Sequence, residues 1–192
     1  MTNLFQVDWT TIPAPTDDGA ASHLLGLRWP AIALPATDGR MVDVSALQGV
    51  TVVYAYPMTG RPGIPLPEGW DMLPGARGCT PQSCAFRDHF AELQQLGVRH
   101  LFGLSTQATD YQAEAAQRLH LPFALLSDAE FRLAEMLGLP AFETAGMRLL
   151  KRLTLIVCDG DITETFYPVF PPDQNAEQVK AWLRSRSSPT FS

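Results

Sequence analysis

Two cysteines five residues apart are the residues of this sequence best suited to chemistry. Cys79 and Cys84 lie in the segment GCTPQSCAFRD, directly after a stretch rich in proline and glycine. Thr80 and Pro81 suit the cap and first turn of a helix, so Cys79 is expected at a helix start. Unpaired backbone N–H groups and the positive end of the helix dipole favour a thiolate there. Because a thiolate attacks electrophiles, the segment predicts a cysteine nucleophile.

The spacing of the two cysteines indicates how they could cooperate. In a continuous helix, Cys84 would lie ~7.5 Å along the axis from Cys79 and be rotated by ~140°. A disulfide needs Cα atoms within about 7 Å of each other. The pair is therefore not expected to bond within an intact helix, but it could bond if the first turns unwind. This behaviour suits a cycle with an attacking thiol and a second thiol that resolves the product.

Other cysteine chemistry fits the sequence less well. The spacing C-x4-C differs from the C-x-x-C of thioredoxin-like oxidoreductases. A zinc site would need two more ligands, and His89 and His100 form no ligand pair of the usual spacing. We therefore predict no metal and no other cofactor. Cys158 follows an apolar segment and precedes a turn, which favours a packing role.

Arginine is the cation expected near such a thiolate. Arg152 opens the apolar segment KRLTLIV, where a buried guanidinium needs an anionic partner. Its charge would favour the ionised form of a nearby cysteine. Arg77, two residues before Cys79, is a second candidate. Arg87 and Asp88 are predicted to form a local surface pair.

The remaining segments predict the elements that must position these residues. Alternating β-type and helical patterns indicate an α/β protein whose mostly parallel central sheet carries helices on its faces. Strands or hairpins are expected at 34–47, 50–56, 98–105, 122–128, 151–157 and 162–169, and helices at 80–96, 108–121, 129–139 and 175–186. Residues 57–78 hold five prolines and five glycines, which nearly excludes regular helix or strand. A loop of this length in a compact domain is often functional.

Length and charge limit the classes of protein to consider. The chain has 192 residues and a formal net charge of −6, without a run of Lys or Arg. One domain is expected, and neither nucleic acid nor an anionic membrane is the expected partner. No segment approaches ~18 consecutive apolar residues, and no secretory signal pattern is present, so we predict the cytoplasm. We divide the chain into an arm (1–25), a domain (26–186) that contains the loop, and a flexible tail (187–192).

Several segments together resemble a peroxiredoxin of the Q type, the bacterioferritin-comigratory-protein group. They are VVYAYP, GCTPQSCAFRD, LPFALLSDAEFRLAEMLGL and RLTLIVCDGDI. The resemblance extends from about Trp29 to Arg184. It implies a thioredoxin-like fold with a central mixed β-sheet flanked by helices and an N-terminal β-hairpin. By the same resemblance, Cys79 matches the peroxidatic cysteine, Cys84 the resolving cysteine, and Arg152 the arginine that holds the thiolate and the peroxide.

Two positions depart from the family pattern P-x-x-x-T-x-x-C, in which the threonine hydroxyl is directed at the peroxide. The corresponding positions before Cys79 hold Met72 and Ala76. A YP-x-T sequence ending at Thr59 instead precedes the Pro/Gly-rich loop, as though the loop had been inserted between threonine and cysteine. We hypothesise that the loop folds out and back and leaves Thr59 near Cys79. Otherwise Thr80 or a backbone N–H must donate instead.

The resemblance implies a thiol-dependent peroxidase that reduces hydrogen peroxide or alkyl hydroperoxides. Its intramolecular disulfide would be recycled by thioredoxin or a similar dithiol, and the chain would be a monomer or weak homodimer. Arg77, Gly78 and Thr80 are the residues expected to bind substrate. The alternative is a peroxide-responsive redox sensor or interaction module with low turnover, which a steady-state assay with a thioredoxin system would distinguish. A thiol–disulfide oxidoreductase is disfavoured by the absence of C-x-x-C, and insulin reduction without peroxide tests it.

Overall fold

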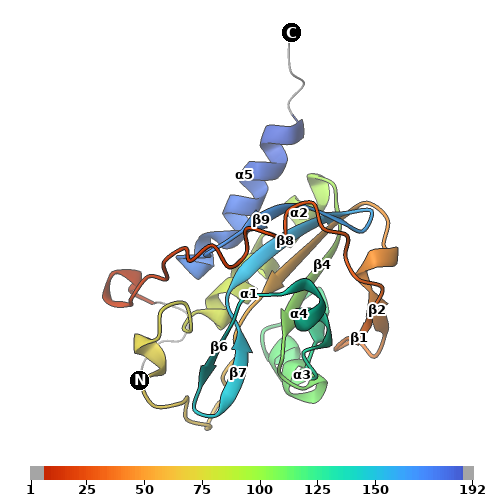
Figure 1. Cartoon of the computed structure of the whole chain (residues 1–192). Coiled ribbons are helices and arrows are strands. Elements are labelled where there is room, and N and C mark those ends of the chain that lie inside the picture. Colours follow the sequence, from red (N-terminus) through yellow and green to blue (C-terminus); the bar gives the residue numbers. More distant parts are fainter. Residues whose placement is uncertain (1–6, 188–192) are drawn as a thin grey trace.

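A five-stranded sheet lies at the centre of the computed structural model, which describes residues 7–187 (Figure 1). Its strand order is β5 (Leu125–Ser127), β4 (Val98–Ser105), β3 (Val50–Ala55), β8 (Leu153–Cys158) and β9 (Asp161–Phe166). The pairs β3–β4 and β4–β5 are parallel, whereas β3–β8 and β8–β9 are antiparallel. The sheet is therefore mixed rather than mostly parallel, because β8 and β9 pair antiparallel. Its middle strand, β3, pairs with the strand that follows Arg152.

The two faces of the sheet have different partners because successive side chains of a strand point to opposite faces. The helices are α1 (Cys79–Asp88), α2 (Phe90–Gln95), α3 (Thr109–Arg118), α4 (Arg132–Leu137) and α5 (Asn175–Ser187). Val52 and Tyr54 of β3 pack in a buried cluster with apolar side chains of α1, α2 and α5. Val53 and Ala55 point into the opposite cluster, to which α4 contributes. The cysteine-bearing helix therefore lies on the α5 face.

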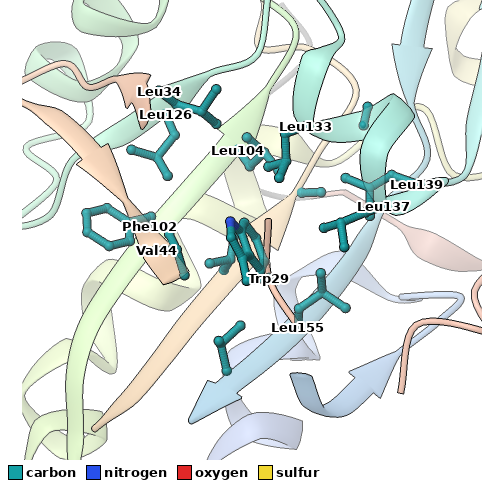
Figure 2. Close-up of a cluster of buried hydrophobic side chains, with 14 of the residues drawn as sticks. Trp29, Leu34, Val44, Phe102, Leu104, Leu126, Leu133, Leu137, Leu139 and Leu155 are labelled. Atoms are coloured by element: carbon teal, nitrogen blue, oxygen red, sulfur yellow. The ribbon is translucent and has the colours of Figure 1, made fainter. Parts of the chain in front are cut away.

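The opposite cluster is an apolar core built around Trp29. Figure 2 shows its indole among leucine side chains of β4, β5, β8 and α4. Leu34 reaches this core from a hairpin of two strands, β1 (Ala33–Pro35) and β2 (Met41–Asp43). Complete burial of such a side chain contributes about 1.5–3 kcal/mol. This core supports the sheet from the side that carries none of the predicted site residues.

Many of the predicted elements are present, including the hairpin, the strand at 98–105 and the C-terminal helix. The prediction of one helix capped by Thr80 is wrong in two respects. The helix begins at Cys79 because Gly78 adopts a left-handed φ of 113° and its carbonyl accepts the Gln82 N–H at 3.0 Å. It also ends at His89, whose backbone leaves the helical region, and α2 follows directly.

A second hairpin was not predicted. It consists of β6 (Ala141–Thr144) and β7 (Met147–Leu150). Ala145 and Gly146 between them have φ values of 48° and 72°, as a two-residue hairpin turn requires. The turn was not recognised in the sequence because its first position is alanine, and the usual turn dipeptides are Asn-Gly and Asp-Gly.

The Pro/Gly-rich insertion, residues 57–78, has an ordered interior. It contains one short 3-10 helix, η3 (Trp70–Met72). Trp70 and Ala76 are buried in a small separate core with Leu149 of β7. The edge of this core is formed by partly buried apolar side chains: Met58, Leu73, Phe142 and Met147. The insertion is therefore held by its own apolar contacts with the β6–β7 hairpin.

The segment before the family-like region is the arm predicted at 1–25. From residue 7 it forms a 3-10 helix, η1 (Trp9–Thr11), and then turns. Residues 1–6 of the arm and residues 188–192 of the predicted tail lie outside the described residues. Between residues 7 and 187, no helix combines the length and apolar character needed to cross a membrane.

Candidate active site

Cys79 lies at the first position of α1, and only 4% of it is exposed. Gly78 precedes it in a tightly enclosed position. A Cβ on this glycine would lie 2.5 Å from Pro172 of the 3-10 helix η4 (Pro172–Gln174) and 2.8 Å from the Trp9 ring. The left-handed φ and the lack of space both require glycine here. The close packing around Gly78 therefore fixes where α1 begins and where the Cys79 sulfur lies.

Arg152 is the cation that the structure brings to Cys79. It directly precedes β8 and shares the strand periodicity of Thr154, so it points to the face covered by α1 and α5. Its Nη2 lies 3.3 Å from Cys79 Sγ, and only 2% of the residue is exposed. A buried guanidinium at this distance stabilises negative charge on the sulfur more strongly than it would in water.

The same nitrogen holds the end of the insertion. Nη2 of Arg152 donates toward the carbonyl oxygens of Gly75, Ala76 and Arg77 at 3.2–3.3 Å. The sulfur itself lies 3.7 Å from the Ala76 carbonyl oxygen, a long contact that an ionised sulfur would not favour. Two N–H groups thus serve four acceptors. Arg152 therefore ties the end of the insertion to the Cys79 sulfur.

A buried polar network holds the Arg152 guanidinium through its other terminal nitrogen, Nη1. Nη1 of Arg152 donates to Gln82 Oε1, and Gln82 Nε2 donates to Asn175 Oδ1 at 2.9 Å. The Thr154 hydroxyl donates to the same Asn175 oxygen at 2.6 Å. The sequence analysis missed Gln82 and Asn175. The spacing of three residues between Cys79 and Gln82 was the available signal, because such residues share one helix face.

A pocket of about 380 Å³ opens in front of Cys79. Both ends of the insertion contribute to its wall, with Met58 and Gly60 at one end and Arg77 and Gly78 at the other. The predicted substrate-binding residues Arg77, Gly78 and Thr80 all line it. Apolar side chains from the middle of the insertion and from η3 complete the wall: Ile64, Leu66 and Trp70. The pocket has space for a peroxide that carries an organic group.

Thr59 is buried between two residues that line this pocket, Met58 and Gly60. Its hydroxyl donates to Gln107 Oε1 at 3.2 Å, and its N–H donates to the same oxygen at 2.8 Å. Gln107 Nε2 donates back to the Thr59 carbonyl at 3.1 Å. The insertion does fold out and back, because its two ends meet at one pocket. In this structure the Thr59 hydroxyl bonds to Gln107. Its role as a hydrogen-bond donor to the peroxide stays a prediction.

Cys84 lies in the middle of α1 with 8% of its surface exposed, and it is not joined to Cys79. Burial raises the pKa of the Cys84 thiol, and the charge of Arg87 offsets part of this effect. The thiol is therefore protonated at neutral pH while α1 is intact. Its use as a second reactive sulfur requires the first turns of α1 to open.

Two further features, a cysteine and a charged pair, were expected to have no part in the chemistry, and both lie away from the pocket. Cys158, at the end of β8, is half-buried, and its Sγ lies 3.4 Å from the Thr163 hydroxyl. The predicted surface pair is present, with Arg87 Nε 2.8 Å from Asp88 Oδ1. Neither feature reaches the pocket at Cys79.

The chain belongs to the Redoxin family, whose sequence model matches residues 24–181. Within it, the chain is a peroxiredoxin of the Bcp/Q group. Peroxiredoxin Bcp of Escherichia coli strain K12 is 29% identical over 163 residues, which cover 82% of this chain and 94% of the relative. Peroxiredoxin Q, chloroplastic, of Sedum lineare is 28% identical over 160 residues, covering 81% of this chain and 75% of the relative.

Solved structures confirm the predicted thioredoxin-like fold. The crystal structure of Peroxidoxin BcpB from Mycobacterium tuberculosis aligns with a TM-score of 0.68 and 25% identity, covering 85% of this chain and 98% of that one. Peroxiredoxin Q of Xanthomonas campestris aligns with a TM-score of 0.65, covering 84% and 98%. At 20% identity, this second likeness concerns the fold alone.

Proposed function

We propose that Cys79 is the peroxidatic residue of this thiol peroxidase, which reduces hydrogen peroxide or alkyl hydroperoxides. The Cys79 thiolate attacks the terminal peroxide oxygen, and the O–O bond breaks. The departing alkoxide or hydroxide takes a proton and leaves as alcohol or water. Cys79 becomes a sulfenic acid, oxidised by two electrons, while the peroxide is reduced. The observation that carries this proposal is the 3.3 Å contact between Arg152 Nη2 and Cys79 Sγ at the base of an open pocket.

Arg152 has a second role in this proposal, at the oxygen atoms. Negative charge moves from the sulfur along the breaking O–O bond in the transition state. The guanidinium and the free N–H groups of the first turn of α1 stabilise that charge without reorganising. The network through Gln82 and Asn175 keeps the guanidinium in place during this step. Arg77, Gly78 and Thr80 line the path of the substrate.

The resolving residue in this proposal is Cys84. Its thiol condenses with the Cys79 sulfenic acid to give an intramolecular disulfide and one water. Both sulfurs belong to α1, so its first turns must open before they meet. An external dithiol such as thioredoxin then exchanges with the disulfide and restores both thiols. The proposed assembly is a monomer or weak homodimer, and the proposed compartment is the cytoplasm.

Cys84→Ser tests the resolving step. We expect this variant to consume about one equivalent of peroxide at the normal rate and then to stop or recycle slowly, because Cys79 has no internal partner. Peptide mass mapping after one equivalent of peroxide measures the product. The unmodified chain should yield a Cys79–Cys84 crosslink, and the variant a sulfenic acid on Cys79. Undiminished steady-state turnover of Cys84→Ser with a thioredoxin system would contradict the assignment.

Thr59→Val tests the proposed hydroxyl donor. If Thr59 turns from Gln107 to the peroxide during the reaction, the loss of one donor should lower the second-order rate of Cys79 oxidation about tenfold or more. Valine has nearly the same shape as threonine, and Thr59→Ser keeps the hydroxyl, so the serine variant should stay close to the normal rate. Stopped-flow measurement of Cys79 oxidation compares the three chains. A full rate for Thr59→Val would assign the donor to Thr80 or a backbone N–H.

A further inference from the structure

The N-terminal arm crosses the segment at which α1 begins. Figure 1 shows this red segment beside the yellow insertion. The Trp9 ring lies against Gly78, since a Cβ on that glycine would be 2.8 Å from Trp9 Cη2. The indole N–H donates to Asp173 Oδ2 at 2.8 Å, and the ring meets Phe170 edge-on at 5.9 Å between centroids. Trp9 is thus fixed between η4 and the residue that precedes Cys79.

Further along, the same arm is anchored beside Arg152. Pro15 lies 3.5 Å from where a Cβ of Gly75 would stand. Asp18 accepts hydrogen bonds from Lys151 Nζ at 2.6 Å and from the Tyr167 hydroxyl at 2.7 Å. Residues 7–18 therefore run over both ends of the segment 75–78, whose carbonyls bind Arg152 and whose last residue caps α1. We call residues 7–18 the strap.

The strap is a feature of this chain rather than of the matched domain. The family model begins at residue 24, after the strap ends. Within the strap, Val7 reaches the pocket in front of Cys79. Trp9 holds the strap at one place, through its hydrogen bond and its edge-on ring contact, and the Asp18 carboxylate holds it at a second.

We propose that the strap holds the first turn of α1 in its peroxide-reactive form, and that Trp9 is a positioning residue that limits how fast Cys79 and Cys84 join. This rests on the proposed intramolecular disulfide. Opening the first turn moves Gly78 and Cys79, and Gly78 has no free space beside the indole. Trp9 must therefore leave Gly78 before the two sulfurs can meet, and the strap is released in the disulfide form.

The strap then influences which of two reactions consumes the sulfenic acid. In one, the Cys84 thiol forms the disulfide and releases water. In the other, a second peroxide adds an oxygen to Cys79, giving sulfinic acid and an alcohol or water. Slower opening of α1 favours the second reaction. A weaker strap should therefore give faster disulfide formation and less sulfinic acid at high peroxide.

Trp9→Ala tests the proposal, with Trp182→Ala as the matched control. Trp182 is also half-buried and donates its indole N–H to a carboxylate, Glu164, at 2.7 Å, but it lies on α5 and its partner on β9. In rapid-mixing experiments, Trp9→Ala should form the disulfide at least about fivefold faster, which is the low end of the effect expected from losing one aromatic contact and one hydrogen bond together. The first oxidation of Cys79 should slow only slightly, because Pro172 still encloses Gly78 and Arg152 still contacts the sulfur. Trp182→Ala should leave disulfide formation unchanged. Equal disulfide rates in Trp9→Ala and the unmodified chain would overturn the proposal.

Hydrogen exchange on the unmodified chain gives a test that needs no variant. The amides of Thr11 and Ile12 donate within η1 and should be protected in the reduced form. In the disulfide form they should exchange faster, because the strap has left α1. Equal protection in both forms would also overturn the proposal. If peroxide produces no Cys79–Cys84 disulfide at all, the proposed function fails at its resolving step, which is a different outcome from an unchanged strap.

Discussion

Cys79→Ser is expected to lower kcat/KM for peroxide on the order of 10³-fold or more, because a serine hydroxyl is not ionised at neutral pH and is a weaker nucleophile. The substitution exchanges one atom at the base of the pocket, so the fold and Arg152 should remain in place. Stopped-flow measurement of peroxide consumption with a dithiol reductant gives the rate, and circular dichroism confirms the fold.

Cys158→Ser is the control for this experiment. Cys158 lies at the end of β8, and its sulfur contacts Thr163 rather than the pocket. We expect this variant to keep peroxide turnover within about twofold, since Cys158 is only half-buried and a change of one atom away from the pocket has a small effect. If Cys79→Ser retained more than a tenth of the normal turnover, the nucleophile would have to be another group.

Arg152→Gln is expected to lower the rate of Cys79 oxidation by about 10²–10³-fold, the usual loss for a charge-stabilising donor in a buried site. Glutamine removes the cation and the bond to the Cys79 sulfur together. Arg152→Lys keeps the charge but cannot bond to Gln82 and the insertion carbonyls at once, so its rate should be intermediate. Stopped-flow oxidation kinetics measure the rate, and absorbance at 240 nm measures the thiolate at neutral pH.

Arg148→Gln is the matched control for the arginine. Arg148 is exposed, pairs with Glu135 at 3.0 Å and stacks on the Phe131 ring at 4.5 Å. Its loss should leave the oxidation rate within about twofold, because exposed ion pairs contribute little. An Arg152→Gln variant that folds and reacts as fast as Arg148→Gln would show that the cation has no part in the reaction.

The sequence was informative where local patterns decide the structure. The strand at 98–105 and the hairpin at Asp38-Gly39 follow from apolar runs and turn residues, and both are present. Cys79 was expected at a helix start and lies at one, but the cap is Gly78 rather than Thr80. The choice between Thr80 and Gly78 depends on the contacts of Gly78 with Trp9 and Pro172, which are distant in the sequence.

Long-range polar contacts were the part of the site that local patterns could not reveal. Arg152 was identified because an arginine stands out beside an apolar strand. Gln82 and Asn175 are polar residues in helices that contain other polar residues, so the sequence does not single them out. Their role depends on a hydrogen-bond network that joins α1, β8 and α5. The course of the insertion was likewise open, because it depends on a hairpin, β6–β7, that the sequence analysis did not detect.

The small core shared by the insertion and the β6–β7 hairpin has a consequence for protein engineering. Trp70 and Ala76 come from one segment and Leu149 from the other, so neither segment buries its apolar side chains alone. Excising the loop to shorten the chain would leave the hairpin with an apolar surface exposed to solvent. Grafting the loop onto another scaffold would expose its tryptophan in the same way. A successful chimera would have to transplant both segments as one module.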